Sequence, residues 1–143
     1  MTTTIRRLAA VAGLVLGATL FTPLTAAAQH VPIMVRHVGS DQVGKQYVAD
    51  LGARLRSSER YEITVSKDEA MLGLHLVSTD ANEQDAGEAS AIAITMTLGP
   101  AQSNSYMHTW VIIVGRDRTQ DMAQALLGAI DAAVAQLKVQ RTE

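Results

Sequence analysis

A short apolar run, Met71–Val77, constrains the fold of this chain more than any other segment. It lies between a charged step, Lys67–Glu69, and a long polar stretch from Ser78 to Ser90. Both alternating sets of its side chains are mostly apolar, one being Leu72, Leu74 and Leu76 and the other Met71, Gly73, His75 and Val77. A strand that is apolar on both sides is typical of the interior of a sheet. We therefore expect this run at the centre of a sheet, with the other elements as its neighbours and cover.

Residues 1–28 have the pattern of a secretory signal peptide. Arg6 and Arg7 precede an apolar stretch over residues 8–20, and Ala26–Ala28 supplies the small residues of a cleavage site. We expect Sec-type export with cleavage after Ala28. A retained membrane anchor is the first alternative, which the apolar stretch disfavours because it is shorter than the ~20 residues that span a bilayer. Twin-arginine export is the second alternative, to which the flanking residues correspond poorly.

The charge and the cysteine content narrow the classes of protein that remain. The full chain has 12 basic and 14 acidic side chains, and loss of the two leader arginines leaves a net charge of −4. A mildly acidic domain does not attract nucleic acid by its overall field. The chain has no cysteine, which excludes disulfides, thiolate metal ligands, cysteine nucleophiles and a lipid-modified cysteine. We expect residues 29–143 to form one small soluble domain, periplasmic or secreted, without a stable membrane anchor.

Hydrophobic periodicity predicts an α+β domain with two layers. A helix separates the first two strands, which predicts a parallel crossover, and the last three strands follow one another, which predicts an antiparallel meander. Two helices then cover one face of a mixed five-stranded sheet in the order β-α-β-β-β-β-α. The expected strands are Val31–Val38, Tyr61–Val65, Met71–Val77, Ala91–Leu98 and Tyr106–Val114, and the expected helices are Asp41–Arg56 and one with an apolar stripe from Met122 to Leu137.

The segment Thr79–Ser90 contains four acidic residues and no large apolar one. This composition predicts an exposed loop. The acids do not alternate as the ligands of a calcium loop do, so we expect no calcium site there.

A resemblance emerges from two stretches, "LGARLRSSERYEITV" and "DEAMLGLHLVS". In the first stretch a helix ending near serine leads to a short strand, and in the second an acidic step enters a central strand. This order resembles the small periplasmic α/β domain of the TolB amino-terminal, LpoB-like and CsgG-like group. The resemblance implies a binding or assembly module without enzymatic activity, and it carries over no catalytic residue. The lipobox cysteine and the following propeller domain of members of that group have no counterpart in this sequence.

Four side chains on the expected strands are candidates for a ligand or partner surface: His75, Tyr106, His108 and Trp110. We expect Tyr106, His108 and Trp110 to form an aromatic stripe opposite the helices, with His75 on the same face. The alternative is ordinary cross-strand contact between these side chains. Two histidines without a carboxylate make a poor metal site, so we expect no metal and no cofactor. His37, at the end of its strand, is expected on the surface.

Motifs for catalysis are missing from the sequence. No Gly-x-Ser-x-Gly elbow occurs, and adjacent Asp68 and Glu69 would point to opposite sides of a strand. We therefore expect a non-enzymatic binding or assembly module of the cell envelope. It would bind an envelope protein, or a second copy of itself, through an exposed sheet face. The alternative function is a periplasmic small-ligand or metal-binding protein that uses His75, His108 and Trp110.

Overall fold

The computed structural model describes residues 30–82, 84, 86–99 and 105–140, with side chains described as far as residue 136. The expected signal peptide and the expected contact of Leu137 therefore lie outside the described residues. In chain order the elements are β1 (Val31–Val38), α1 (Gln42–Ser57), β2 (Tyr61–Ile63), β3 (Leu72–Asp80), β4 (Ala89–Leu98), β5 (Ser105–Gly115), a short 3-10 turn (Arg116–Arg118) and α2 (Thr119–Gln140).

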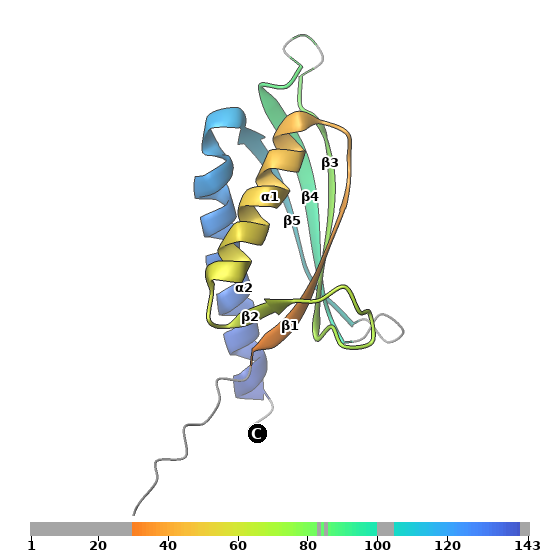
Figure 1. Ribbon diagram of the computed structural model, residues 1–143, viewed down its shortest axis with the longest axis vertical. Coiled ribbons are helices and arrows are strands. Elements are labelled where there is room, and N and C mark those ends of the chain that lie inside the picture. Colours follow the sequence, from red (N-terminus) through yellow and green to blue (C-terminus); the bar gives the residue numbers. More distant parts are fainter. Residues whose placement is uncertain (1–29, 83, 85, 100–104, 141–143) are drawn as a thin grey trace, which may run out of the picture.

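These elements form two layers, a five-stranded mixed sheet and a pair of helices on one of its faces (Figure 1). The strand order is β2-β1-β3-β4-β5. β1 is parallel to both β2 and β3, whereas β3, β4 and β5 form an antiparallel meander. The two helices lie side by side and run in the same direction (Figure 1). The predicted α+β architecture and the central position of β3 are confirmed.

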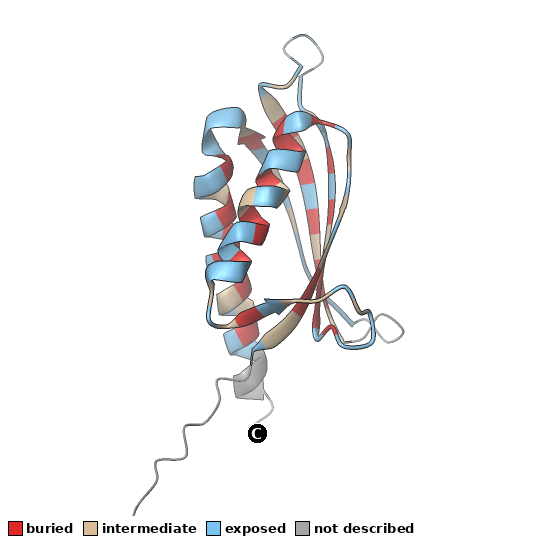
Figure 2. Cartoon of the chain, in the orientation of Figure 1, coloured by how far each residue is buried: buried red, intermediate tan, exposed pale blue. Residues whose placement is uncertain are grey.

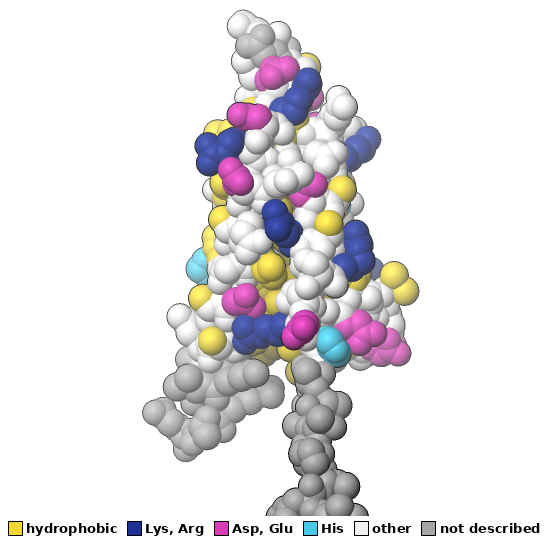
Figure 3. Space-filling model, turned by 60° about the vertical axis from the view of Figure 1, so that its left-hand side comes forward, with side chains coloured by type: hydrophobic (Ala, Val, Ile, Leu, Met, Phe, Trp, Pro, Cys, Tyr) yellow, Lys and Arg dark blue, Asp and Glu magenta, His cyan; other side chains and the backbone are white. Residues whose placement is uncertain are grey.

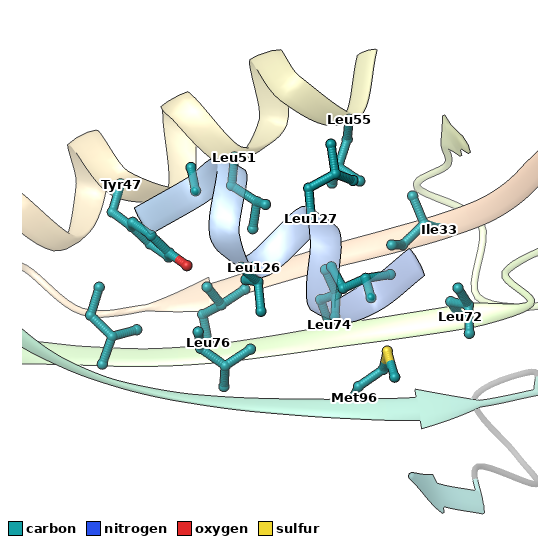
Figure 4. Packing of buried hydrophobic residues seen from close by; sticks show 14 of the residues in the cluster. Ile33, Tyr47, Leu51, Leu55, Leu72, Leu74, Leu76, Met96, Leu126 and Leu127 are labelled. Carbon is teal, nitrogen blue, oxygen red and sulfur yellow. The ribbon is translucent and has the colours of Figure 1, made fainter. Parts of the chain in front are cut away.

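The core lies between the helices and the sheet, where buried residues of both layers meet (Figure 2). α1 contributes a stripe at helical spacing, and Figure 4 shows its Tyr47 and Leu51 on the side of the sheet to which Leu76 points. The strands contribute alternate residues, as expected for strands with one face covered. The core residues of the strands are Ile33, Tyr61, Leu72, Leu74, Leu76, Ile92, Ile94, Met96 and Val114, and those of the helices are Val43, Tyr47, Leu51, Leu55, Ala123, Leu126, Leu127, Ile130 and Val134.

Three predicted strand ends are wrong by two residues or more. β2 ends at Ile63, and Val65 is 96% exposed. In the other direction, β3 and β4 continue well into the segment expected to be a loop, with Asp80 paired to Ser90. The ladder extends because its polar side chains find partners: Ser90 Oγ donates to the Thr79 carbonyl at 3.2 Å, and Asp80 Oδ1 accepts from the Gly87 amide at 2.8 Å.

Candidate functional site

The sheet face opposite the helices is the candidate site, and we call its exposed part over β1, β3, β4 and β5 the open face. Because paired residues on neighbouring strands share a face, the register defines rows that cross the sheet. The middle row is entirely apolar and runs through consecutive partners. It consists of Val38, Val77, Ala93 and Val111, which we call the valine row.

The neighbouring rows are mainly small and uncharged. On one side of the valine row lie Thr79, Ala91 and Ile113, and on the other lie Arg36, His75, Thr95 and Thr109. A further row holds Met34, Gly73, Thr97 and Tyr106. The first three of these residues are buried, whereas Tyr106 is 68% exposed and belongs to the open face. Arg36 is the one Lys, Arg, Asp or Glu in these rows. By contrast, charged side chains of both signs are scattered over the side on which α2 lies (Figure 3).

Large apolar side chains of the open face are exposed to an unusual degree. Val111 is 75% exposed, Ile113 70% and Val77 56%. Single exposed apolar residues are normal on a protein surface, but a contiguous group of them marks a contact surface. The valine row and Ile113 form such a group because they are neighbours in the register of adjacent strands.

The sequence-predicted candidates do not share one face. His75 pairs with Thr95 and lies on the open face, as does Tyr106, which pairs with Thr97. His108 pairs with Met96, whose neighbours on that face are in the core. Thr95 and Met96 are adjacent on β4 and point to opposite faces. The expectation that His75 and His108 lie together is therefore wrong, and a sheet separates the two rings.

A β-bulge explains why Tyr106 and His108 also lie on opposite faces of the sheet. The register between β4 and β5 shifts between Met96 and Thr97, so that Met107 is an extra residue in β5. Two residues of a strand that are two positions apart normally share a face, but an inserted residue reverses the alternation. The expected aromatic stripe is thus divided: Tyr106 is on the open face, while His108 and Trp110 are on the helix-covered face.

His108 and Trp110 remain together at the sheet edge. Their ring centroids are 4.4 Å apart with the planes tilted by 46°. Trp110 lines an apolar hollow between β5 and α2, which we call the β5–α2 groove. The groove has a volume of about 150 Å³ and is lined by Ile94, Trp110, Ile112, Met122, Ala125, Leu126 and Ala129. This volume is below the 300–1,000 Å³ that is usual for small-molecule pockets.

A serine, a histidine and an aspartate are in contact, but their hydrogen bonds do not run in the directions that nucleophilic catalysis needs. Ser78 Oγ donates to Asp41 Oδ1 at 2.5 Å, and His37 Nε2 lies 2.7 Å from Ser78 Oγ. The serine has a single hydroxyl hydrogen and gives it to the carboxylate, so His37 Nε2 must be the donor to Ser78. In a catalytic triad the histidine instead accepts the serine proton and donates to the carboxylate.

This polar cluster fixes the start of α1. Asp41 is buried, and its Oδ2 accepts a hydrogen bond from the Gly44 amide at 2.7 Å, which caps the helix. A side chain at Gly39 or Gly44 would collide with Ser78 Oγ. Burial of Asp41 by itself raises its pKa, but hydrogen bonds from the Ser78 hydroxyl and the Gly44 amide outweigh burial and hold the pKa below 3.8. His37, expected on the surface, is half-buried in this cluster, a correction that follows from its bond to Ser78.

No group of three or more His, Asp or Glu side chains is placed to hold a metal ion within the described ranges. In the same part of the chain, no helix combines the length and apolarity required to cross a bilayer. A polar hollow of about 250 Å³ is lined by Gln42, Val43, Gln46, Arg116 and Thr119. Arg116 there is held by the Gly87 carbonyl, which its Nε reaches at 2.8 Å.

Comparison with known proteins gives a fold but no function. No protein-family model and no curated sequence matches this chain. Among solved structures, TolB from Acinetobacter baumannii is similar over 76% of this chain, with a TM-score of 0.51 and 10% identity. The chain shares its fold with the amino-terminal region of TolB. The match spans 29% of the TolB chain. The predicted resemblance to this domain is confirmed at the level of fold.

Two further structures are similar at lower TM-scores. The hypothetical protein CT253 from Chlamydia trachomatis matches 77% of this chain and 96% of its own, with 10% identity and a TM-score of 0.42. A minor lipoprotein from Acinetobacter baumannii matches 69% of this chain and 92% of its own, with 12% identity and a TM-score of 0.43.

Proposed function

We propose that this chain is an exported, non-enzymatic binding or assembly module of the bacterial cell envelope, and that the open face is its docking surface. In this proposal residues 1–28 are a signal peptide, and residues 29–143 act in the periplasm or outside the cell. The observation that carries the proposal is the valine row, which exposes apolar side chains across four strands of the sheet. A surface of this kind costs free energy in water unless another surface covers it.

The composition of the open face supports protein docking over ligand capture. The valine row forms the apolar centre of the face. Tyr106 and His75 add an aromatic and a polar side chain beside it. Protein interfaces are depleted of charge at their centres and enriched in tyrosine. We assign His75 and Tyr106 to this surface, whereas His108 and Trp110 belong to the β5–α2 groove on the other face.

The absence of enzymatic activity in the proposal is supported by the polar cluster. This cluster caps α1 and joins it to β3 through Ser78, His37 and Asp41. The Ser78 hydroxyl donates its proton to the Asp41 carboxylate and so is not activated by His37. The envelope location is supported by the leader pattern and by the sequence resemblance. The fold that the chain shares with TolB is consistent with this location.

Site-specific photo-crosslinking in the producing bacterium tests the proposal. A photoreactive amino acid replaces Val111 in the valine row, or Val65, which is even more exposed but lies off the open face. We expect a crosslinked protein band at Val111 that is missing at Val65 and that disappears when Val77→Asp is combined with the probe. A band of equal strength at Val65, or no band at Val111, would contradict docking through the open face.

A further inference from the structure

We infer that β5 pairs edge to edge with β5 of a second copy of this chain, in the antiparallel direction, so that the two sheets join into one continuous sheet. β5 is the last strand of the sheet, and among the described strands it pairs with β4 alone (Figure 1). The surface concerned is the edge of the sheet, which is separate from docking through the open face. The inference therefore goes beyond the proposed function and fails or holds independently of it.

The backbone of β5 carries hydrogen-bonding groups that point away from the sheet. The Arg116 amide donates to the Glu88 carbonyl at 2.8 Å, and these two residues are opposite each other in the register of β4 and β5. In antiparallel strands, residues that bond the neighbouring strand alternate with residues whose N–H and C=O groups point to the other side. The residues of β5 that bond β4 are therefore Trp110, Ile112 and Val114, and those that face the free edge are Thr109, Val111 and Ile113.

The edge formed by β5 lacks the usual protection against strand pairing. Proteins normally protect an edge strand with charged residues, with proline, with a bulge or by keeping the strand short. β5 is 11 residues long and contains no Lys, Arg, Asp, Glu or Pro. Its bulge lies at Met107, near one end, so the register with β4 is regular from His108 to Gly115. The long regular part of this edge is thus open to another strand.

The other edge of the sheet explains why the occupant is a second β5. β2 has only 3 residues, Tyr61–Ile63, and one of them is the exposed Glu62, so it is protected by its length and by its charge. A second copy brings the same uncharged edge as the first, and antiparallel pairing of β5 with β5 covers both long edges at once. Only the two short β2 edges then remain, so the assembly closes at two copies and does not grow into a fibre.

The flank of α2 beside this edge allows a second copy to come close. Ala125 and Ala129 line the β5–α2 groove together with Trp110, and Ala125 is exposed. Asp121, one turn before Ala125, is paired with Arg118 at 3.3 Å. Small side chains let packed helices approach to about 8–10 Å. We therefore expect the α2 helices of the two copies to meet beside the paired strands.

The area of this flank suits a stable dimer. The 11 residues of β5 span about 37 Å at about 3.4 Å per residue. One sheet layer and one helix layer together are about 20 Å deep. The flank therefore covers about 700 Å² per copy, and two copies bury about 1,400 Å², which lies within the range of about 1,200–2,000 Å² for specific interfaces.

Sedimentation velocity of the purified protein between about 1 μM and about 1 mM measures the expected monomer–dimer equilibrium. We expect Val111→Pro to weaken dimerisation at least tenfold, because it removes an N–H group that faces the free edge. The ladder to β4 does not use that group, and proline is tolerated on an edge strand at such a position. Circular dichroism spectra that match the wild type establish that the variant is folded.

A second variant tests the same interface without a change in any strand. Ala125→Glu places like charges on the two α2 flanks, and we expect it to weaken dimerisation at least tenfold as well. Its matched control is Gln124→Glu, which adds the same charge at an exposed position on the other side of α2 and should dimerise as the wild type does. A dimer that survives both Val111→Pro and Ala125→Glu overturns the β5 edge as its interface. A protein that is monomeric at every concentration overturns the inference altogether.

Val77→Asp separates this inference from the proposed function. The substitution blocks docking through the open face but lies on β3, away from the edge, so the dimer should persist. Loss of the dimer in Val77→Asp would overturn pairing through β5. In the crosslinking experiment at Val111, a band at twice the mass of the chain identifies edge pairing, whereas a band of another mass that Val77→Asp abolishes identifies docking through the open face.

Discussion

The Ser78 hydroxyl donates a hydrogen bond to the Asp41 carboxylate across 2.5 Å, although the two residues are 37 positions apart in the sequence. Ser78 belongs to β3 and points to the helix-covered face, and Asp41 is the residue that caps α1. The pair therefore attaches the start of the first helix to the central strand, and it does so in a buried position.

Replacement of Asp41 by alanine should destabilise the fold. The substitution leaves the Gly44 amide and the Ser78 hydroxyl without their acceptor, and unsatisfied buried groups of this kind cost about 1–3 kcal/mol. Urea denaturation should show the loss as a lower midpoint with an unchanged slope. Asp68→Ala, at an exposed aspartate outside the cluster, is the matched control and should leave the midpoint nearly unchanged. Equal effects at the two positions would show that the cap contributes nothing specific.

The contribution of Asp41 should depend on pH in a defined direction. Burial raises the pKa of Asp41, but the hydrogen bonds from Ser78 and Gly44 outweigh burial, so the pKa in the folded protein lies below the usual 3.8. A carboxyl group with a lowered pKa stabilises the folded state above its unfolded pKa, and this stabilisation is lost as the pH falls through the folded pKa. The difference in unfolding free energy between the wild type and Asp41→Asn should be constant above about pH 5 and shrink below about pH 4. A difference that grows on acidification would refute the assigned sign.

Filling the β5–α2 groove should shield Trp110. Ala129 lines this groove with Trp110, which is the only tryptophan in the chain and so the only source of its fluorescence band. Ala129→Leu should reduce quenching of that fluorescence by iodide and raise stability by about 0.5–2 kcal/mol, as cavity filling commonly does. Ala132→Leu, at an exposed position outside the groove, should change neither measurement. Unchanged quenching in Ala129→Leu would mean that Trp110 is not covered from the helix side.

The elements of the fold are largely predictable from local pattern. The apolar run around Leu74 indicated a central strand, and the helical spacing of Val43, Tyr47 and Leu51 indicated the face that α1 buries. The ends of β3 and β4 were missed because hydrophobic alternation stops at Val77 while the backbone ladder continues to Asp80. A backbone ladder needs only N–H and C=O groups, so polar residues can extend it where their side chains find partners.

The candidate site was predictable only in part. An exposed sheet face was expected, but the sequence placed Tyr106, His108 and Trp110 together on it. The bulge at Met107 separates Tyr106 from the other two, and no local sequence signal announces that bulge. The contact between His37, Ser78 and Asp41 was likewise not predicted, because its members come from different elements.

The sequence by itself determined the alternation and periodicity of its apolar residues, and hence the strands, the helices and the two-layer class, since each depends on neighbours a few positions away. Tertiary structure alone decided which strand edges meet, where the register shifts, and therefore which side chains share the open face. Register is a long-range property: an insertion of one residue in one strand redirects side chains relative to strands far away in the sequence.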